Sequence, residues 1–102
     1  MRISIQKLPA VTERAFQAQV ISMAKMLGWM VYHTHDSRRS EPGFPDLVLV
    51  RERIIYAELK TDKGRQSPEQ LIWLSKLNQA GAETYLWRPR DWDEIEKRLK
   101  SR

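Results

Sequence analysis

The sequence predicts an α/β protein in which a small mixed β-sheet is flanked by helices, in the order α-β-β-β-α-β-α. Two segments carry apolar residues at helical spacing, and each of them stops at a glycine, Gly28 or Gly81. Short runs rich in β-branched and aromatic residues lie around them and read as strands. The length of 102 residues suits one domain, which we expect to span residues 1–102.

The first helix is expected from about Thr12 to Leu27, directly before Gly28. Its apolar side chains fall on one face, which favours packing against a core. These side chains are Phe16, Val20, Met23, Ala24 and Leu27. The aromatic and β-branched run at residues 29–33 predicts the first strand.

A polar loop from Thr34 to Pro45 precedes a predicted β-hairpin. The loop is long for so small a domain, which favours a functional role. Residues 46–50 and 54–60 are apolar runs joined by a short polar turn, so we expect them to pair antiparallel. The second arm is apolar on both faces, as expected of an interior strand.

The second helix has a well-defined start, with Ser67 at the N-cap, Pro68 in the first turn and Gln70 able to complete a capping box. Residues 82–87 form the fourth predicted strand, parallel to the third because a helix connects the two. Asp91 is expected to cap a last helix that ends near residue 100. Core burial is the favoured interpretation for five large side chains: Trp73, Leu74, Leu77, Trp87 and Trp92.

The chain is basic, with 18 Lys+Arg against 13 Asp+Glu, a formal net charge of +5 and a pI of about 9.8. This balance suggests a polyanionic partner such as nucleic acid. The absence of cysteine excludes disulfides, zinc fingers and thiol nucleophiles, and agrees with a reducing, cytoplasmic setting. No apolar run is long enough to predict a spanning helix.

Charged side chains gather at the ends of the predicted hairpin arms. Glu58 and Lys60 point to one face of their strand, with Leu59 on the other. Asp46 opens the neighbouring arm, so an antiparallel register can place its carboxylate beside Glu58. Adjacent carboxylates repel unless a cation lies between them, and magnesium prefers oxygen ligands of this kind. The backbone carbonyl of Leu59 can supply a further oxygen ligand. Glu13, in the first turn of the first helix, could hold a second ion or a metal-bound water.

Lys60 would have a chemical role beside such a metal. Its ammonium can orient or help deprotonate the attacking water and can neutralise charge on a phosphate, while the metal lowers the pKa of that water. Taken alone, Pro45-Asp46 is an ordinary strand opener and Glu58-Leu59-Lys60 an ordinary surface ion pair. Only their joint occurrence with Glu13 points to catalysis.

Four motifs follow one another within residues 12–88: Glu13-xxx-Gln17, Gly43-Phe44-Pro45-Asp46, Glu58-Leu59-Lys60 and Ser67-xx-Gln70-xx-Trp73-Leu74-xx-Leu77-xxx-Gly81. Residues 47–57, which separate the two acidic motifs, are the length of a hairpin. The set resembles the PD-(D/E)XK nuclease signature, and most closely its VRR-NUC branch in the stand-alone form of phages and bacteria. This resemblance implies a restriction-endonuclease-like core.

By position, the resemblance implies metal ligands at Glu13, Asp46 and Glu58 and a catalytic lysine at Lys60. It implies an accessory role in the active site for Gln70, which also has a complete explanation as a helix cap. The implied cofactor is Mg²⁺ or Mn²⁺. Stand-alone domains of this kind lack the DNA-binding domains of larger relatives, so the substrate class of those relatives does not transfer with the motifs.

Basic residues of the two loops that flank the acidic motifs are expected to contact DNA phosphates, with solvated loop charge as the alternative. They are Arg38, Arg39, Lys63 and Arg65. His33 and His35 are not assigned to a metal, because two ligands do not make a site.

These observations favour a metal-dependent endonuclease that hydrolyses phosphodiester bonds in DNA. The chain has no helix-turn-helix, so recognition by DNA shape is favoured over recognition by base sequence. Paired cuts in a branched substrate need two sites, so a homodimer is expected, and by resemblance the substrate is a four-way (Holliday) junction. The alternatives are a flap or restriction-type nuclease within a larger assembly and a non-catalytic nucleic-acid-binding module.

Overall fold

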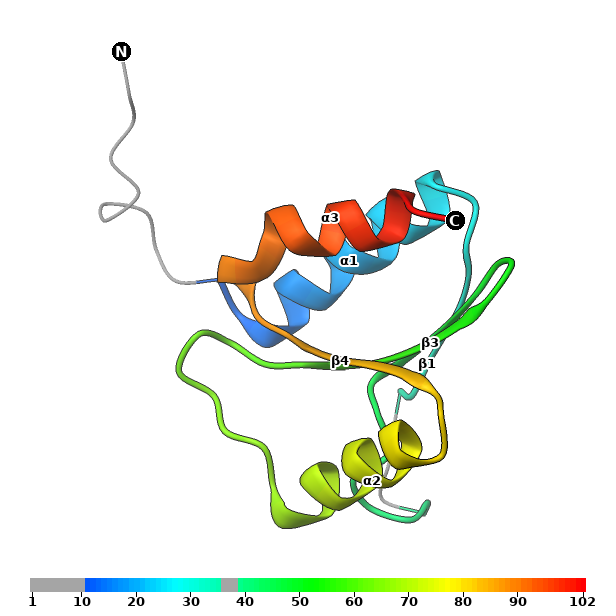
Figure 1. Cartoon of the computed structure of the whole chain (residues 1–102). Helices are drawn as coiled ribbons and strands as arrows, with labels where there is room; N and C mark the ends of the chain where they lie inside the picture. The colour runs from blue at the N-terminus through cyan, green and yellow to red at the C-terminus, as the bar shows by residue number, and fades with distance from the viewer. Residues whose placement is uncertain (1–10, 36–38) are drawn as a thin grey trace.

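The computed structural model describes residues 11–35 and 39–102 of the chain (Figure 1). Its elements follow the predicted order, with a short 3₁₀ turn added before the last helix. They are α1 (Glu13–Met26), β1 (Met30–His33), β2 (Leu47–Val50), β3 (Ile54–Leu59), α2 (Pro68–Gln79), β4 (Glu83–Trp87), η2 (Pro89–Asp91) and α3 (Trp92–Lys100). No helix in the described part of the chain is long and apolar enough to cross a membrane.

The strands form one mixed sheet in the order β1-β2-β3-β4. β2 pairs antiparallel with β1 and with β3, whereas β3 and β4 are parallel, which confirms the predicted hairpin and crossover. β3 is therefore an interior strand, as its apolar sequence predicted. Leu47 lies opposite Ala57 in the β2–β3 register. Asp46 directly precedes Leu47 and Glu58 directly follows Ala57, so the antiparallel register makes Asp46 and Glu58 neighbours across the hairpin.

Helices cover both faces of the sheet, with α1 and α3 on one side and α2 on the other (Figure 1). The core lies between the sheet and the α1–α3 layer. Its fully buried side chains come from both: Phe16, Val20, Ala24, Leu47, Leu49, Ile55, Ala57, Leu59, Ile95 and Leu99. Because side chains alternate along a strand, Ala57 and Leu59 enter this core while Glu58 points to the α2 side.

The α2 helix begins as predicted but is less buried than predicted. Ser67 and Gln70 form the expected reciprocal capping box. None of the helix residues is fully buried, and Trp73, Leu74 and Leu77 are half-buried, which corrects their assignment to the core. The reason is that α2 packs chiefly on β4 and β3, so the sheet covers only one face of the helix.

Asp91 also behaves differently from the prediction. Its carboxylate accepts a hydrogen bond from the backbone N–H of Arg88 at 2.9 Å and thereby closes the η2 turn. It makes no side-chain cap on α3. Asp91 does stand at the predicted N-cap position of α3, but its carboxylate is already bonded to the start of the 3₁₀ turn.

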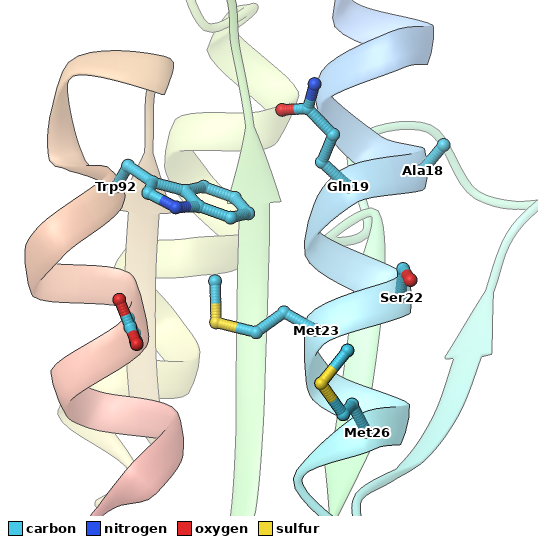
Figure 2. A pocket seen from close by; sticks show the side chains of 7 residues that line it. Ala18, Gln19, Ser22, Met23, Met26 and Trp92 are labelled. Atoms are coloured by element: carbon cyan, nitrogen blue, oxygen red, sulfur yellow. The ribbon is translucent and has the colours of Figure 1, made fainter.

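A groove runs along the outer surface between α1 and α3 (Figure 2). Trp92 of α3 and Met23 of α1 point toward one another across it, and both pack against the core. Trp87 is buried in the core as expected, whereas Trp92 is half-buried and packs against the core from outside it. The groove contains none of the predicted catalytic residues, so we assign it no role in catalysis.

Arg51, in the hairpin turn, joins the ends of two helices. Its guanidinium donates hydrogen bonds to the backbone carbonyls of Leu27 (2.9 Å), Leu99 (3.1 Å) and Ser101 (2.6 Å). It also lies 4.5 Å from the centre of the Trp29 ring. A planar group with several donors suits carbonyls at helix C-termini, where the helix dipole favours positive charge.

Replacing Arg51 by lysine should therefore lower the free energy of unfolding by about 1–3 kcal/mol, because an ammonium cannot reach all three carbonyls and cannot stack in the same way. Urea denaturation measures the change. Arg98→Lys is the control, since Arg98 makes an exposed pair with Glu94 and should shift stability by only a few tenths of a kcal/mol. Equal effects of the two substitutions would contradict the assignment.

Candidate active site

The candidate active site lies where β2 begins and β3 ends. The hairpin register places Asp46 next to Glu58, as the sequence predicted. The backbone of β3 holds Asp46 in place, because Oδ2 of Asp46 accepts a hydrogen bond from the backbone N–H of Leu59 at 2.8 Å. One carboxylate oxygen of Asp46 is thus fixed by the backbone, and the side chain lines a cleft on the α2 side of the sheet.

Glu58 is a buried carboxylate with an unsatisfied oxygen. Its side chain is 1% exposed, and its Oε2 has no hydrogen-bond partner. The ammonium of Lys60 lies 3.7 Å from this oxygen and 3.9 Å from Oε1 of Glu13. Glu58 and Lys60 therefore face one another as their spacing in the strand predicted.

Burial raises the pKa of Glu58 to about 8. Burial is the largest contribution to this value and the neighbouring charge of Asp46 is the next, while Lys60 opposes both effects only in part. The pKa of Asp46 is also raised, first by burial and then by Glu13, against the hydrogen bond from Leu59 and the charge of Lys60. Taking carboxylates out of water is costly unless a proton or a cation neutralises them.

The carboxylate pair fits a hard divalent cation. The buried, unpartnered Oε2 of Glu58 and the carboxylate of Asp46 supply oxygen ligands of the type that Mg²⁺ and Mn²⁺ prefer. Glu13 does not complete a preformed set, because it is half-exposed and faces Lys60. Within residues 11–35 and 39–102, no three His, Asp or Glu side chains are grouped closely enough to hold one ion.

The loop that carries Asp46 is anchored on α2 through a glycine. Gly43 has a φ of +94°, and a Cβ added there would lie 2.5 Å from the backbone carbonyl carbon of Glu69. The next residue, Phe44, packs edge-on against Trp73 with ring centres 5.2 Å apart, and against Tyr56 at 6.1 Å. The Gly-Phe-Pro-Asp motif therefore has a structural role: it packs the loop against α2 and orients the carboxylate of Asp46.

The loop after Lys60 is held by a residue that the sequence analysis did not single out. The side chain of Arg88 donates to the backbone carbonyls of Thr61 at 2.6 Å and Gly64 at 2.7 Å. The backbone N–H of Lys60 donates to the carbonyl of Trp87 at 3.0 Å and extends the pairing of β3 with β4. The one sequence signal for Arg88 was its place at the end of β4, the strand predicted to lie parallel to β3.

Gln70 forms the helix cap expected from the sequence, and its accessory role in the active site stays a prediction. Its side-chain Oε1 accepts a hydrogen bond from the backbone N–H of Ser67 at 2.8 Å, and its backbone N–H donates to Ser67 Oγ at 3.1 Å. The same side chain lines the cleft that contains Asp46. The cap fixes the amide oxygen, so the amide NH₂ is the group left for a ligand.

Three of the four predicted phosphate-binding residues lie on the surface of the described part of the chain. Arg39, Lys63 and Arg65 are exposed, and Arg38 lies outside the described residues. Their contact with DNA stays a prediction. The rings of His33 and His35 are 4.1 Å apart, and His35 lines the cleft beside Asp46.

Comparisons with known proteins agree with this arrangement. Residues 5–91 match the VRR-NUC domain family. A solved structure described as a VRR_NUC domain protein superposes with a TM-score of 0.73 and 18% sequence identity, over 90% of this chain and 88% of that one. Another, described as a VRR_NUC domain, has a TM-score of 0.71 and 23% identity, over 89% of this chain and 97% of that one. No curated protein matches the chain. The chain therefore belongs to the VRR-NUC family, within the PD-(D/E)XK nuclease superfamily.

Proposed function

We propose that the protein is a divalent-metal-dependent, structure-selective DNA endonuclease that acts as a homodimer on branched DNA, with the four-way junction as its preferred substrate. Family membership supports a nuclease of the PD-(D/E)XK type with a DNA substrate. The observation that carries the proposal is the pair Asp46–Glu58, with a raised pKa on both carboxylates and the amine of Lys60 beside them.

Asp46, Glu58 and the backbone carbonyl of Leu59 would hold the metal, and Glu13 would approach it through water. The bound metal supplies charge that lowers the pKa of a water and stabilises the oxygens of the phosphate in the transition state. Lys60 donates hydrogen bonds to the attacking water and to a non-bridging phosphate oxygen. The water releases a proton to solvent as its oxygen forms a bond to phosphorus, the bond to the leaving oxygen breaks, and that oxygen takes up a proton from solvent.

The surrounding protein restricts how these groups can move. The backbone of Leu59 orients Asp46, and Arg88 holds the loop that follows Lys60. Such fixed geometry contributes to catalysis because the reacting groups do not have to be ordered during the reaction. Arg39, Lys63 and Arg65, together with Arg38, would bind phosphates without reading the sequence.

A dimer follows from the substrate. One site cuts one strand, so paired cuts across a branch point require two sites related by symmetry. Cleavage of labelled four-way junctions, flaps and linear duplexes with Mg²⁺ or Mn²⁺ tests the choice of substrate. Symmetric nicks across the junction support the proposal. A preference for flaps or for linear duplex would instead favour a flap or restriction-type nuclease.

Lys60→Ala is expected to lower the cleavage rate at least about 100-fold, because it removes the only donor proposed for the attacking water. The rate is measured under single-turnover conditions with saturating protein. Lys76→Ala is the matched control, since Lys76 is exposed in the last turn of α2. Cleavage that survives Lys60→Ala would contradict the mechanism. Binding of DNA without cleavage in either metal would favour a non-catalytic binding module.

A further inference from the structure

The cleft beside Asp46 has a chemical character that metal binding alone does not require. It measures about 430 Å³. It lies on the α2 side of the sheet, between β1 and α2. Aromatic side chains contribute to its walls, with Tyr32 on the β1 side and Phe44 and Trp73 on the other.

The wall on the α2 side is rigid. Phe44 is held edge-on between Tyr56 of β3 and Trp73 of α2, with ring centres 6.1 and 5.2 Å away. Tyr32, on edge strand β1, faces the same side of the sheet as Tyr56, because the registers align both with Val48. Tyr32 is 61% exposed, so its ring is available to a ligand.

The side chains that line the cleft are mostly uncharged. Its lining includes the acidic side chains of Glu41 and Asp46 and, among the described residues, no lysine or arginine. Neutral polar groups are present instead, including the hydroxyls of Thr34 and Ser40 and the amide NH₂ of Gln70 that the helix cap leaves free.

We propose that this cleft receives one unstacked nucleobase from the DNA strand next to the bond that is cut. A nucleobase is flat, neutral and edged with hydrogen-bond donors and acceptors, which matches an aromatic wall with polar groups at its rim. The inference rests on the proposed nuclease function and deepens it. The enzyme selects DNA whose base beside the scissile phosphate leaves the stack at little cost, which is the case at a branch point.

A cycle of DNA and protein changes tests the proposal. Four-way junctions are prepared with an abasic residue at each nucleotide within a few positions of the cut, alongside the intact junction. Their affinity for the protein is measured by fluorescence anisotropy in EDTA, so that no cleavage occurs. The variants are Tyr32→Ala, Tyr32→Phe and, as the matched control, Met30→Ala, an exposed side chain on the same strand and face that does not line the cleft.

Tyr32→Ala should weaken binding of the intact junction roughly tenfold, and one abasic position should weaken binding of the unaltered protein by a similar factor. Combining the two should cause no further loss, because both remove the same contact. Tyr32→Phe should retain affinity, and Met30→Ala should behave as the unaltered protein. Additive losses, or no loss from either change, would overturn the proposal.

The outcome is separable from that of the nuclease proposal. Junction cleavage that is indifferent to every abasic position, with no coupling to Tyr32, would remove the nucleobase site and leave the nuclease in place. A protein that cuts no DNA with either metal would remove the nuclease function. The binding cycle would then still decide whether the cleft takes a base.

Discussion

Replacing Glu58 by glutamine is expected to reduce DNA cleavage at least about 1,000-fold while making the metal-free protein more stable at neutral pH. The loss of activity follows because the amide provides no negative charge for a divalent cation. The gain in stability follows because Glu58 is a buried carboxylate beside Asp46, with only Lys60 to offset it. A residue kept at a cost to the fold is typical of a functional site.

The same carboxylate sets a pH dependence whose sign is opposite to that of a salt-bridged acid. The pKa of Glu58 is about 8 in the folded protein, above the ordinary value of 4.5. Between these values the folded state binds more protons than the unfolded state. The free energy of unfolding therefore falls as the pH rises from about 4.5 to about 8, and Asp46, whose pKa is also raised, contributes in the same direction.

Urea denaturation in EDTA at intervals between pH 5 and pH 8 measures this effect. The unaltered protein should lose about 2–4 kcal/mol across the range through Glu58, and Glu58→Gln should remove most of that slope. Added Mg²⁺ should restore stability to the unaltered protein and have little effect on Glu58→Gln. Glu96→Gln is the control, because it breaks only an exposed pair with Lys100. A slope that is unchanged in Glu58→Gln would contradict this account.

The sequence was most informative where local chemistry decides the structure. Ser67 and Gln70 form the predicted cap because each satisfies a free N–H at the helix start, within a few residues. The pairing of Asp46 with Glu58 was also predictable, because a short turn between two apolar runs leaves an antiparallel hairpin little freedom in register. The side-chain alternation of β3 then placed Lys60 beside Glu58.

The features that sequence reasoning missed depend on contacts between distant segments. Arg88 holds the loop after Lys60 only because β4 ends beside it, and no local pattern marks an arginine for that task. The half-buried state of Trp73 follows from how far α2 extends across the sheet, which periodicity does not encode. Glu13 was expected to bind the metal, but in the structure its carboxylate lies beside the ammonium of Lys60.

Gly43→Ala is expected to lower both cleavage and stability, although Gly43 holds no ligand itself. At its φ of +94° an alanine is strained, and its Cβ would lie 2.5 Å from the backbone of Glu69. Backbone atoms cannot move aside as a flexible side chain can, so the loop has to leave α2. The carboxylate of Asp46, three residues further along the chain, would then no longer be oriented toward Glu58.

We expect Gly43→Ala to cost about 2–4 kcal/mol of folding free energy and to reduce cleavage at least about 100-fold at a temperature where the protein remains folded. Gly81→Ala separates the two causes, because Gly81 has a similar φ of +97° but nothing lies within 4 Å of an added Cβ. It should lose only the strain, about 1 kcal/mol, and cleave normally. If both variants lose stability equally and both cleave normally, the loop does not need its contact with α2 to position Asp46.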